Sequence, residues 1–546
     1  MFRRVHRGFL CANRAIPAVE NERERKKAVA EAAQRVADGS VPTHKRLFQL
    51  KRELGEKYGL HSVLRNSEIL EAIPAECREA AIKLLKKRWV RTISGVSPVA
   101  IMCNAGCPHG RCAYCPRGDD AAQSYTGMEP AARRAKQNNF DPFAQVKERV
   151  AQLEAIGHAT EKVELIIMGG TFNALPAGKQ DEFVKRALDA LNGSESASLS
   201  EALKTNETAE HRAVGITFEV RPDWCKQKHV DELLRMGATR VEIGVQTLSD
   251  EVYRKVNRGH TVQDVADATR ALKDSALKVL YHMMPGLLSD EEKDVAMFGQ
   301  LFADERFKPD MLKIYPFLVM PGTEMYEWWK RGEIQPYSAQ EAARVLAKAA
   351  QHIPRYCRVM RVQRDIPADL IAAGIKNSNL RELAETEMRR MGVKCECIRC
   401  RELGLKMLKQ KIEPDWESVE PGRIDYDASG GKELFLSFDE KTHDALVGFL
   451  RLRIPGESKR PEIDCKTAVV RELHVYGEAL KLGEKSSDGD VQHKGFGEKL
   501  LKKAEETARD EFDKNKLAVI AGAGVKGYYR RLGYADDGVY VSKLLR

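Results

Sequence analysis

The sequence predicts an α/β protein whose central domain is a parallel sheet, curled into a full or partial barrel. Short apolar runs alternate with helical patterns over residues 99–356, and such repeated strand-then-helix units form parallel sheets. The expected strands are Val99–Met102, Val163–Met168, Gly215–Val220, Arg240–Val245, Val279–Met284 and Met311–Tyr315. The expected helices include Phe143–Ile156, Gln180–Leu191, Val262–Ser275 and Glu291–Ala303. A functional site is expected where the strands of such a barrel end.

Two further regions flank this barrel. Residues 22–85 have a helical pattern among many Lys and Arg. After residue 430, the runs Glu433–Phe438, Ala445–Arg453, Ala468–Tyr476 and Leu517–Gly522 indicate antiparallel strands, with an amphipathic helix over 498–513. With 546 residues the chain is long enough for two to four domains. We divide it into a basic helical region (1–95), the barrel (96–356), a linker (357–428) and a C-terminal α+β domain (429–546).

Composition indicates a soluble, cytoplasmic protein. The chain is 43% hydrophobic and 31% charged, and no uninterrupted apolar run is long enough to span a bilayer. Met1–Ala18 contains four Arg and no acid, which weakly resembles a transit peptide, but we favour a basic arm. The net charge of +10 is a modest excess that matters only if it is concentrated on one face.

The most informative stretch is a loop rich in cysteine directly after the first expected strand. Cys107, Cys112 and Cys115 are spaced C-x4-C-x2-C, and Cys103 precedes them. Three thiolates can hold a cubic iron–sulfur cluster with one iron left open. The alternative is a structural zinc loop, in which Cys103 closes the site as a fourth ligand.

Polar or glycine-rich residues also follow the later strands. Gly169-Gly170 comes after the second, and two glycines allow a ligand to approach the backbone closely. Glu219, Gln246 and Lys313 lie at the ends of the third, fourth and sixth strands. Several such ends beside a three-thiol loop predict a binding pocket at this rim.

A second thiol group lies in the linker. Cys395, Cys397 and Cys400 place three sulfurs within six residues, which favours a structural zinc site. The fourth ligand is left open between His352 and Cys357.

Two motifs point to phosphate-bearing partners. Gln492-x-x-Gly495-x-Gly497 precedes the last long helix, and the free N–H groups there can bind a pyrophosphate. The N-terminal region ends in a basic run that suits an RNA backbone, although a solvated helical face is an equally good reading. The residues of this run are Lys83, Lys86, Lys87, Arg88 and Arg91.

These motifs together carry a family resemblance. The three-thiol loop, the Gly-Gly turn and the rim pattern resemble the radical S-adenosylmethionine (SAM) enzymes, and the C-terminal glycine motif with Tyr529 and Gly533 resembles the GNAT acetyltransferases. Nearly the whole chain resembles the catalytic subunits of Elongator, in a compact prokaryote-like form. The stretches that carry this are CPHGRCAYCPRG, QSYTGMEP, MGGTFNALP, EVRPDWC, EIGVQT, NRGHT, HMMPGL, VQRDIP, RELHVYG, QHKGFG and GYYRRLGY. Eukaryotic members have more residues between the first two cluster cysteines than the four found here.

The resemblance implies a tRNA uridine carboxymethyltransferase that acts at C5 of the wobble uridine. In that family a 4Fe-4S cluster cleaves SAM to a 5′-deoxyadenosyl radical, which takes hydrogen from the methyl group of acetyl-CoA, and the carbon radical attacks the uracil. The implied partners are the tRNA anticodon arm, SAM and acetyl-CoA. Whether a homodimer or accessory subunits take part is left open.

The resemblance also implies residue roles. Cys107, Cys112 and Cys115 would bind the cluster, with Cys103 outside the set. Lys313 would face the radical pocket as a catalytic residue, or else serve as a structural ion-pair partner. The SAM contacts would be Gly169, Gly170, Glu219, Gln246 and Lys313. The acetyl-CoA contacts would be Glu472, Leu473, His474, Gln492, Gly495, Phe496, Gly497, Tyr528 and Tyr529, with Tyr529 as proton donor to the departing thiolate and Tyr528 ranked lower as a core residue.

Two rival functions remain at this point. The first is a protein lysine acetyltransferase with a structural cluster, for which Glu472 or His474 would be the general base. The second is a tRNA-binding scaffold without enzymatic activity.

Overall fold

The computed structural model describes all residues except 1–21, 61, 86–92, 117 and 477–494. The chain divides into two compact units. One comprises Met1–Trp89 with Gln152–His158, and the other comprises Val90–Ala151 with Ala159–Arg546. No helix among the described residues is long and apolar enough to cross a membrane.

The first unit contains a small helical bundle: α1 (Glu22–Ala37), α2 (His44–Lys57), α3 (Asn66–Ala72) and α4 (Ala75–Leu85). Each helix turns an apolar stripe inward, so that Ala28, Leu50 and Ile69 are fully buried in one core. The helical pattern expected over residues 22–85 is therefore confirmed.

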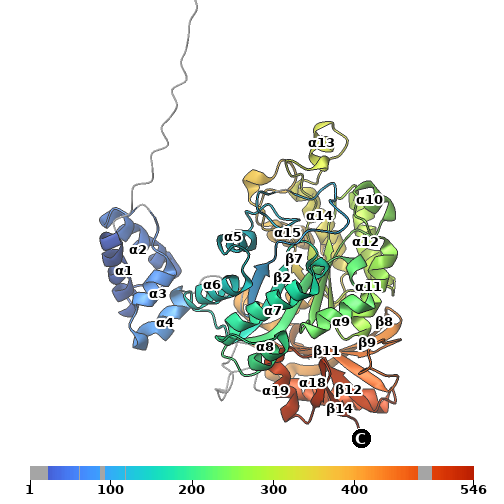
Figure 1. Ribbon diagram of the computed structural model, residues 1–546. Coiled ribbons are helices and arrows are strands. Elements are labelled where there is room, and N and C mark those ends of the chain that lie inside the picture. The colour runs from blue at the N-terminus through green and yellow to red at the C-terminus, as the bar shows by residue number, and fades with distance from the viewer. Residues whose placement is uncertain (1–21, 61, 86–92, 117, 477–494) are drawn as a thin grey trace, which may run out of the picture. The chain divides into compact units, whose positions relative to one another are not determined.

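The second unit begins with a parallel sheet of seven strands in the order β1-β2-β3-β4-β5-β6-β7 (Figure 1). The strands are β1 (Ser97–Met102), β2 (Lys162–Met168), β3 (Arg212–Val220), β4 (Arg240–Gln246), β5 (Lys278–Met283), β6 (Met311–Ile314) and β7 (Arg358–Arg361). Each strand pairs in parallel with the next, and β1 and β7 are the two edges. The expected barrel is therefore an open half-barrel.

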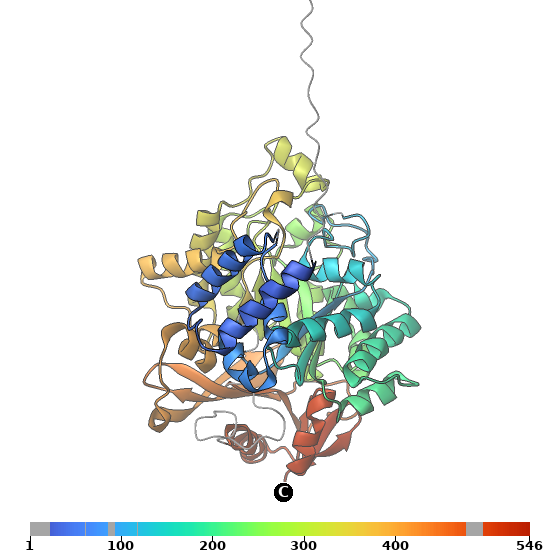
Figure 2. The same ribbon diagram turned by 90° about the vertical axis from the view of Figure 1, so that its left-hand side faces the viewer.

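Helices lie between these strands in the chain, and most of them cover the outer face of the sheet, as Figures 1 and 2 show. They are α5 (Pro130–Gln137), α6 (Pro142–Glu154), α7 (Ala177–Asn192), α8 (Leu199–Asn206), α9 (Gln227–Arg235), α10 (Asp250–Lys255), α11 (Val262–Asp274), α12 (Glu291–Ala303), α13 (Glu324–Lys330) and α14 (Ala339–Ala349). Helix α13 instead stands at the top of Figure 1, and its Met325 N–H donates to the Ala113 carbonyl of the cysteine loop. The six strands expected in the barrel are confirmed to within three residues at each end. The seventh strand, β7, lies in the segment that we expected to be a connector. It was not predicted because its four residues, Arg-Val-Met-Arg, do not form an apolar run.

The linker is also more ordered than its sequence indicates. It contains α15 (Leu380–Met391), α16 (Ile398–Arg401) and α17 (Leu403–Gln410), followed by β8 (Val419–Ala428). Strand β8 was missed because it includes Pro421 and Gly422, and it pairs only with β9 at the edge of the second sheet.

The second sheet has the order β13-β14-β12-β11-β10-β9-β8. Its strands after β8 are β9 (Gly431–Glu440), β10 (Ala445–Ile454), β11 (Thr467–Val475), β12 (Lys516–Val519), β13 (Ala535–Asp537) and β14 (Tyr540–Leu544), with helices α18 (Phe496–Asp510) and α19 (Lys526–Arg531). The all-antiparallel reading of this region was wrong in one place, since β11 pairs in parallel with β12. Helix α18 lies between these two strands in the chain and provides the crossover that parallel neighbours need.

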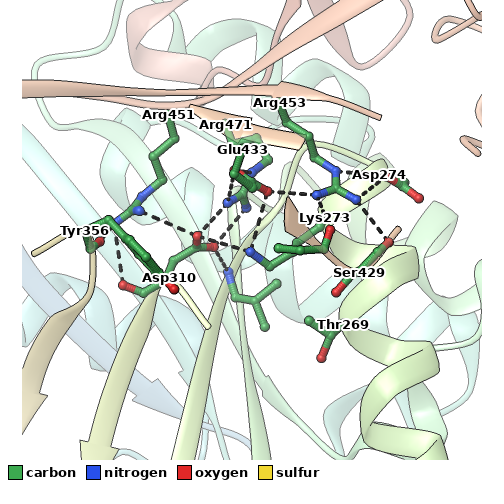
Figure 3. A network of polar contacts seen from close by, with 12 residues as sticks. Thr269, Lys273, Asp274, Asp310, Tyr356, Ser429, Glu433, Arg451, Arg453 and Arg471 are labelled. Atoms are coloured by element: carbon green, nitrogen blue, oxygen red, sulfur yellow. Dashed lines mark hydrogen bonds and ion pairs between the residues drawn. The ribbon is translucent and has the colours of Figure 1, made fainter. Parts of the chain in front are cut away.

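The second sheet packs against the N-terminal ends of the half-barrel strands. Figure 3 shows that arginines of the second sheet point toward acidic residues next to β5 and β6. Arg471 on β11 bonds to both carboxylate oxygens of Asp310, at 2.5 and 2.8 Å. Arg453 on β10 bonds to Asp274 at 2.8 Å, and Lys273 lies 3.5 Å from Glu433. These side chains are all buried, so the two sheets are joined by charges inside the protein.

Candidate active site

The cysteine loop follows β1 at the C-terminal rim of the half-barrel, as expected. Gln123 fixes its shape: the Gln123 side chain accepts a hydrogen bond from the Cys107 N–H at 2.7 Å and donates to the Gly110 carbonyl at 2.6 Å. Tight turns bring the Gly110 N–H to the Cys107 carbonyl and the Cys115 N–H to the Cys112 carbonyl. The three cysteines thereby lie in one compact loop.

Polar groups surround these three thiols. The Thr171 hydroxyl lies 3.4 Å from the Cys107 sulfur, and His109 Nε2 lies 3.4 Å from the Cys112 sulfur. Burial raises the pKa of Cys107 and of Cys115, and the Cys112 thiol nearby raises both further. A bound metal ion would favour the thiolate form of such sulfurs.

Cys103 is different. Its thiol is buried and donates to the Gly169 carbonyl at 3.3 Å, and burial raises its pKa to about 12. A thiol already engaged with a backbone carbonyl fits a three-ligand site better than a four-ligand one. Three cysteines of one loop, with Cys103 engaged elsewhere, fit a cluster with an open iron.

Gly169 and Gly170 have positive φ angles of 109° and 57°. A Cβ atom at either position would collide with a backbone carbonyl of the cysteine loop, from Cys103 at Gly169 and from Ala105 at Gly170. We expected these glycines to make room for a ligand. What they accommodate in the structure is the cysteine loop itself, so any contact with SAM stays a prediction.

Ionic groups line the inner face of the half-barrel just below this loop. Lys313 lies 3.0 Å from Glu219 and also forms an ion pair with Glu242. Glu219 accepts a hydrogen bond from the Tyr125 hydroxyl at 2.9 Å, and His282 lies 2.8 Å from Glu242. Burial works against the charge on Lys313, but Glu219 and Glu242 outweigh it and raise the pKa of this lysine above its usual range. Lys313 is therefore an ammonium ion held between two carboxylates.

Gln246, at the end of β4, has a backbone φ of +75°. Residues other than glycine rarely adopt this conformation, and such strain is often found at functional positions. Any contact of Gln246 with SAM stays a prediction.

The linker thiols also come together. The sulfurs of Cys395, Cys397 and Cys400 lie within 4.8 Å of one another and could hold a metal ion. Neither candidate fourth ligand belongs to this group of described residues. Cys357 is the nearer, because its carbonyl accepts from the Ile398 N–H at 2.9 Å, whereas the His352 ring faces Gly299 on α12.

The sheet of the C-terminal domain opens where the pairing of β11 with β12 ends. These strands pair only as far as Val470 and Val519, so Glu472, Leu473 and His474 lie beyond the pairing and are partly exposed. Gly495 begins α18 with a φ of +71°. Gln492 lies outside the described residues. A helix of 15 residues that starts beside such an opening fits a site for the pyrophosphate of CoA.

The predicted acetyl-CoA residues do not all face this opening. Tyr529 is buried in the hydrophobic core of the domain, and Phe496 packs in an apolar cluster with Leu403 and Val447. The hydroxyl of Tyr528 would lie 3.0 Å from a Cβ atom placed on Gly497. Tyr528 is therefore better placed than Tyr529 to reach a ligand at the Gly495–Gly497 turn.

The basic residues proposed for RNA binding are only partly visible. Lys86, Lys87, Arg88 and Arg91, and the side chain of Lys83, lie outside the described residues. Many other basic side chains of the first unit are paired with acids, at 2.6 Å for Lys57 with Glu31 and for Arg46 with Glu53, for example. The described part of these helices thus resembles a solvated ionic face.

A three-thiol loop at the C-terminal rim of a parallel half-barrel is typical of one class of proteins, the radical SAM enzymes. Residues 101–301 match the model of the radical SAM superfamily, residues 309–390 match the radical SAM C-terminal domain, and residues 25–93 match the ELP3 N-terminal domain. This class implies a 4Fe-4S cluster and SAM as cofactors.

The similarity to individual proteins extends over almost the whole chain. It is 49% identical over 518 residues to a Methanocaldococcus jannaschii protein named tRNA uridine(34) acetyltransferase, covering 93% of this chain and 95% of that one. It is 42% identical over 513 residues to human Elongator complex protein 3, covering 92% and 93%. A solved structure of Methanocaldococcus infernus Elp3 with an N-terminal deletion matches 83% of this chain and all of its own, at 47% identity and a TM-score of 0.75. The chain belongs to the Elongator complex protein 3 (Elp3) family.

Several residues that build the site were not expected to do so. Gln123, Tyr125, Arg221 and Arg258 all contact the cysteine loop or the ionic groups below it. Each lies within a stretch that carries the family resemblance, which is the only sequence signal that could have indicated them.

Proposed function

We propose that this protein modifies tRNA by installing a carboxymethyl group at C5 of the wobble uridine, with SAM as radical source and acetyl-CoA as carbon donor. The observation that carries the proposal is that one compact unit contains two features. The first is the loop of Cys107, Cys112 and Cys115, in which the neighbouring Cys103 is engaged elsewhere, and the second is the end of the β11–β12 pairing together with Gly495 at the start of α18. Relatives named tRNA uridine(34) acetyltransferases support a uridine of tRNA as the substrate.

The residues divide the work as follows. Cys107, Cys112 and Cys115 hold a 4Fe-4S cluster, which when bound supplies the electron that cleaves SAM to a carbon radical. Lys313, fixed between Glu219 and Glu242, presents a positive charge at the base of the radical pocket. Because all of its neighbours are themselves paired, this lysine is held in position before any ligand binds.

In the C-terminal domain the N-terminus of α18 binds the pyrophosphate of CoA, and a tyrosine protonates the departing thiolate. Burial raises the pKa of Tyr528 to about 12. This hydroxyl therefore keeps its proton at neutral pH and is available as an acid.

The proposal is tested by anaerobic reconstitution with iron and sulfide, followed by mass spectrometry of tRNA nucleosides. We expect a carboxymethylated uridine only when SAM and acetyl-CoA are both present, and no product from a Cys112→Ala variant. Product without SAM would refute the radical route, and product without acetyl-CoA would refute the carbon source.

The same samples decide between this function and its rivals. Labelled acetyl-CoA is offered together with tRNA and lysine peptides. Labelled peptide with unmodified tRNA would establish a lysine acetyltransferase, although Glu472 is poorly suited as its base, since Arg451 donates to it at 2.8 Å. Binding of tRNA without any modification would establish a scaffold.

A further inference from the structure

A buried arginine beside the cysteine loop has no acidic partner in the part of the chain that the structure describes. Arg258 lies in the loop after α10 and is only 7% exposed. Among the described residues, no carboxylate lies within ion-pair distance of its guanidinium. A buried charge without a partner is costly, so proteins almost always pair it. The partner of Arg258 must therefore be a group that becomes negative when the protein is loaded.

The geometry points to a sulfur. Arg258 Nη1 lies 3.6 Å from the Cys112 sulfur, and Nη2 donates to the Gly244 carbonyl. The second contact fixes the plane of the guanidinium, so the first is not a chance position of a mobile side chain. Arg258 Nε has no hydrogen-bond acceptor among the described residues.

Two glycines make room for this arrangement. A Cβ atom on Gly244 would lie 2.5 Å from Arg258 Nη2, and one on Gly259 would lie 2.8 Å from the Cβ of His109 in the cysteine loop. Backbone contacts also join the two loops: the Ala113 N–H donates to the Val256 carbonyl at 2.9 Å. The chain thus brings a cation to the cysteine loop from 146 residues away.

A neighbouring arginine provides a contrast. Arg221 is also buried, and its Nη1 lies 3.1 Å from His109 Nε2. However, Asp223 accepts two hydrogen bonds from it, at 2.9 and 3.0 Å. The charge of Arg221 is largely cancelled, whereas that of Arg258 is free to act on the sulfur.

We infer that Arg258 is a positioning residue that acts as the counter-cation of the iron–sulfur cluster and makes the cluster easier to reduce. Reduction adds one electron, taken from an external low-potential reductant, and no bond forms or breaks. A fixed positive charge in a medium of low dielectric constant stabilises the reduced, more negative state. This inference rests on the proposed ligand set Cys107, Cys112 and Cys115.

The test is a redox titration of the reconstituted full-length protein without SAM, tRNA or acetyl-CoA. The reduced cluster is followed by electron paramagnetic resonance at set potentials of dithionite and mediator dyes, together with the iron content per chain. We compare the wild type with Arg258→Gln, which removes the charge, and Arg258→Lys, which keeps it. We expect reduction of the Gln variant to be at least tenfold less favourable, which for one electron corresponds to about 59 mV, and the Lys variant to lie within threefold of the wild type.

An Asp223→Asn variant has the opposite expected sign, because it leaves Arg221 uncancelled and should make reduction more favourable. Equal potentials for Arg258→Gln and the wild type would overturn the inference, as would a Lys variant shifted as far as the Gln variant. Loss of the cluster in the Gln variant alone supports a need for the charge. If both Arg258 variants lose it, an upward shift in Asp223→Asn supports the inference and an unchanged potential overturns it.

The titration is independent of turnover, so a failure of the proposed function does not affect it. A cluster that persists in Cys112→Ala would instead refute the ligand set. If Arg258 served only to bind the carboxylate of SAM, the potentials measured without SAM would not change.

Discussion

The buried ionic network between the two sheets can be tested by removing its most connected member, Arg471 (Figure 3). Arg471 is fully buried and bonds to Asp310, to Glu433 at 2.9 and 3.1 Å, and to the Leu277 carbonyl at 2.8 Å. After Arg471 is replaced with Met, the remaining partners of the two carboxylates are the other arginines and Lys273, which lies 3.6 Å from Asp310 and 3.5 Å from Glu433. Breaking a buried ion pair typically costs about 3–5 kcal/mol. The free energy of separating the two sheets should fall by this amount.

The assay is equilibrium urea unfolding of the full chain, analysed at the first transition. A loss of about 3–5 kcal/mol raises the population of the opened state about 10²- to 10⁴-fold. The matched control is Arg423→Met, which removes an arginine that is also paired with two acids, Asp425 at 2.7 Å and Glu511 at 2.8 Å, but whose side chain is 33% exposed. An exposed pair is worth less than about 1 kcal/mol. Equal losses in the two variants would refute the argument that burial gives the network its strength.

The same network has a dependence on pH with a definite sign. Burial opposes the charge on Asp310 and on Glu433, but Arg471 and Lys273 outweigh it and hold both pKa values below their usual range. Groups with lowered pKa values in the folded state bind protons less readily than in the unfolded state. Their stabilising contribution is complete above pH about 4 and is lost as the pH falls below it. The unfolding midpoint of Arg471→Met should therefore fall less steeply below pH 4 than that of the wild type, and parallel curves would contradict this.

Three further predictions concern the sites. Cys103→Ala should keep the visible absorbance of the reconstituted cluster and Cys112→Ala should lose it, and loss in both would contradict the three-ligand site. Tyr528→Phe should slow tRNA modification at least tenfold in single-turnover assays, because a general acid contributes about 10²–10⁴-fold to the rate. Tyr529→Phe should alter the stability of the protein more than its rate. If Tyr529→Phe slowed the reaction more than Tyr528→Phe, the proton donor would be Tyr529. Cys397→Ser should release one zinc ion per chain as measured by atomic emission, and a wild type without zinc would remove the basis for that site.

The strands of the half-barrel could be predicted because they are nearly continuous apolar runs, which strands covered by helices require. Strand β7 could not, since Arg358 at its start is compensated by Glu402 at 2.5 Å, a residue far along the chain. The parallel pairing of β11 and β12 was also missed. Pairing direction depends on where α18 crosses the sheet, and local apolar alternation does not contain that information.

Prediction of the candidate site from the sequence has the same limit, because only local patterns can be read from it. The spacing of Cys107, Cys112 and Cys115 is local, so the sequence alone predicts a metal-binding loop there. The groups that surround it are not local: Arg258 reaches Cys112 across 146 residues, and Arg364 reaches the carbonyl of Ser124 across 240. Charges that act on the loop are therefore visible only once the fold is known.

The fold also places the two proposed centres at opposite ends of the same strands. The cysteine loop lies at the C-terminal rim, whereas the second sheet packs at the N-terminal ends, where Glu472 lies near Arg240 and Lys278. Strand β4 has seven residues, so these ends are about 20 Å apart.

A line of ion pairs runs along the inner face of the sheet between these ends. Arg240 lies 3.1 Å from Glu164 and 3.5 Å from Glu242, and Glu242 is paired with Lys313 next to the cysteine loop. Because each charge on this line has an opposite neighbour, these four residues form a continuous series of ion pairs. A reaction that uses both centres must carry a group past these ion pairs, of which Arg240 and Glu242 are buried in the structure.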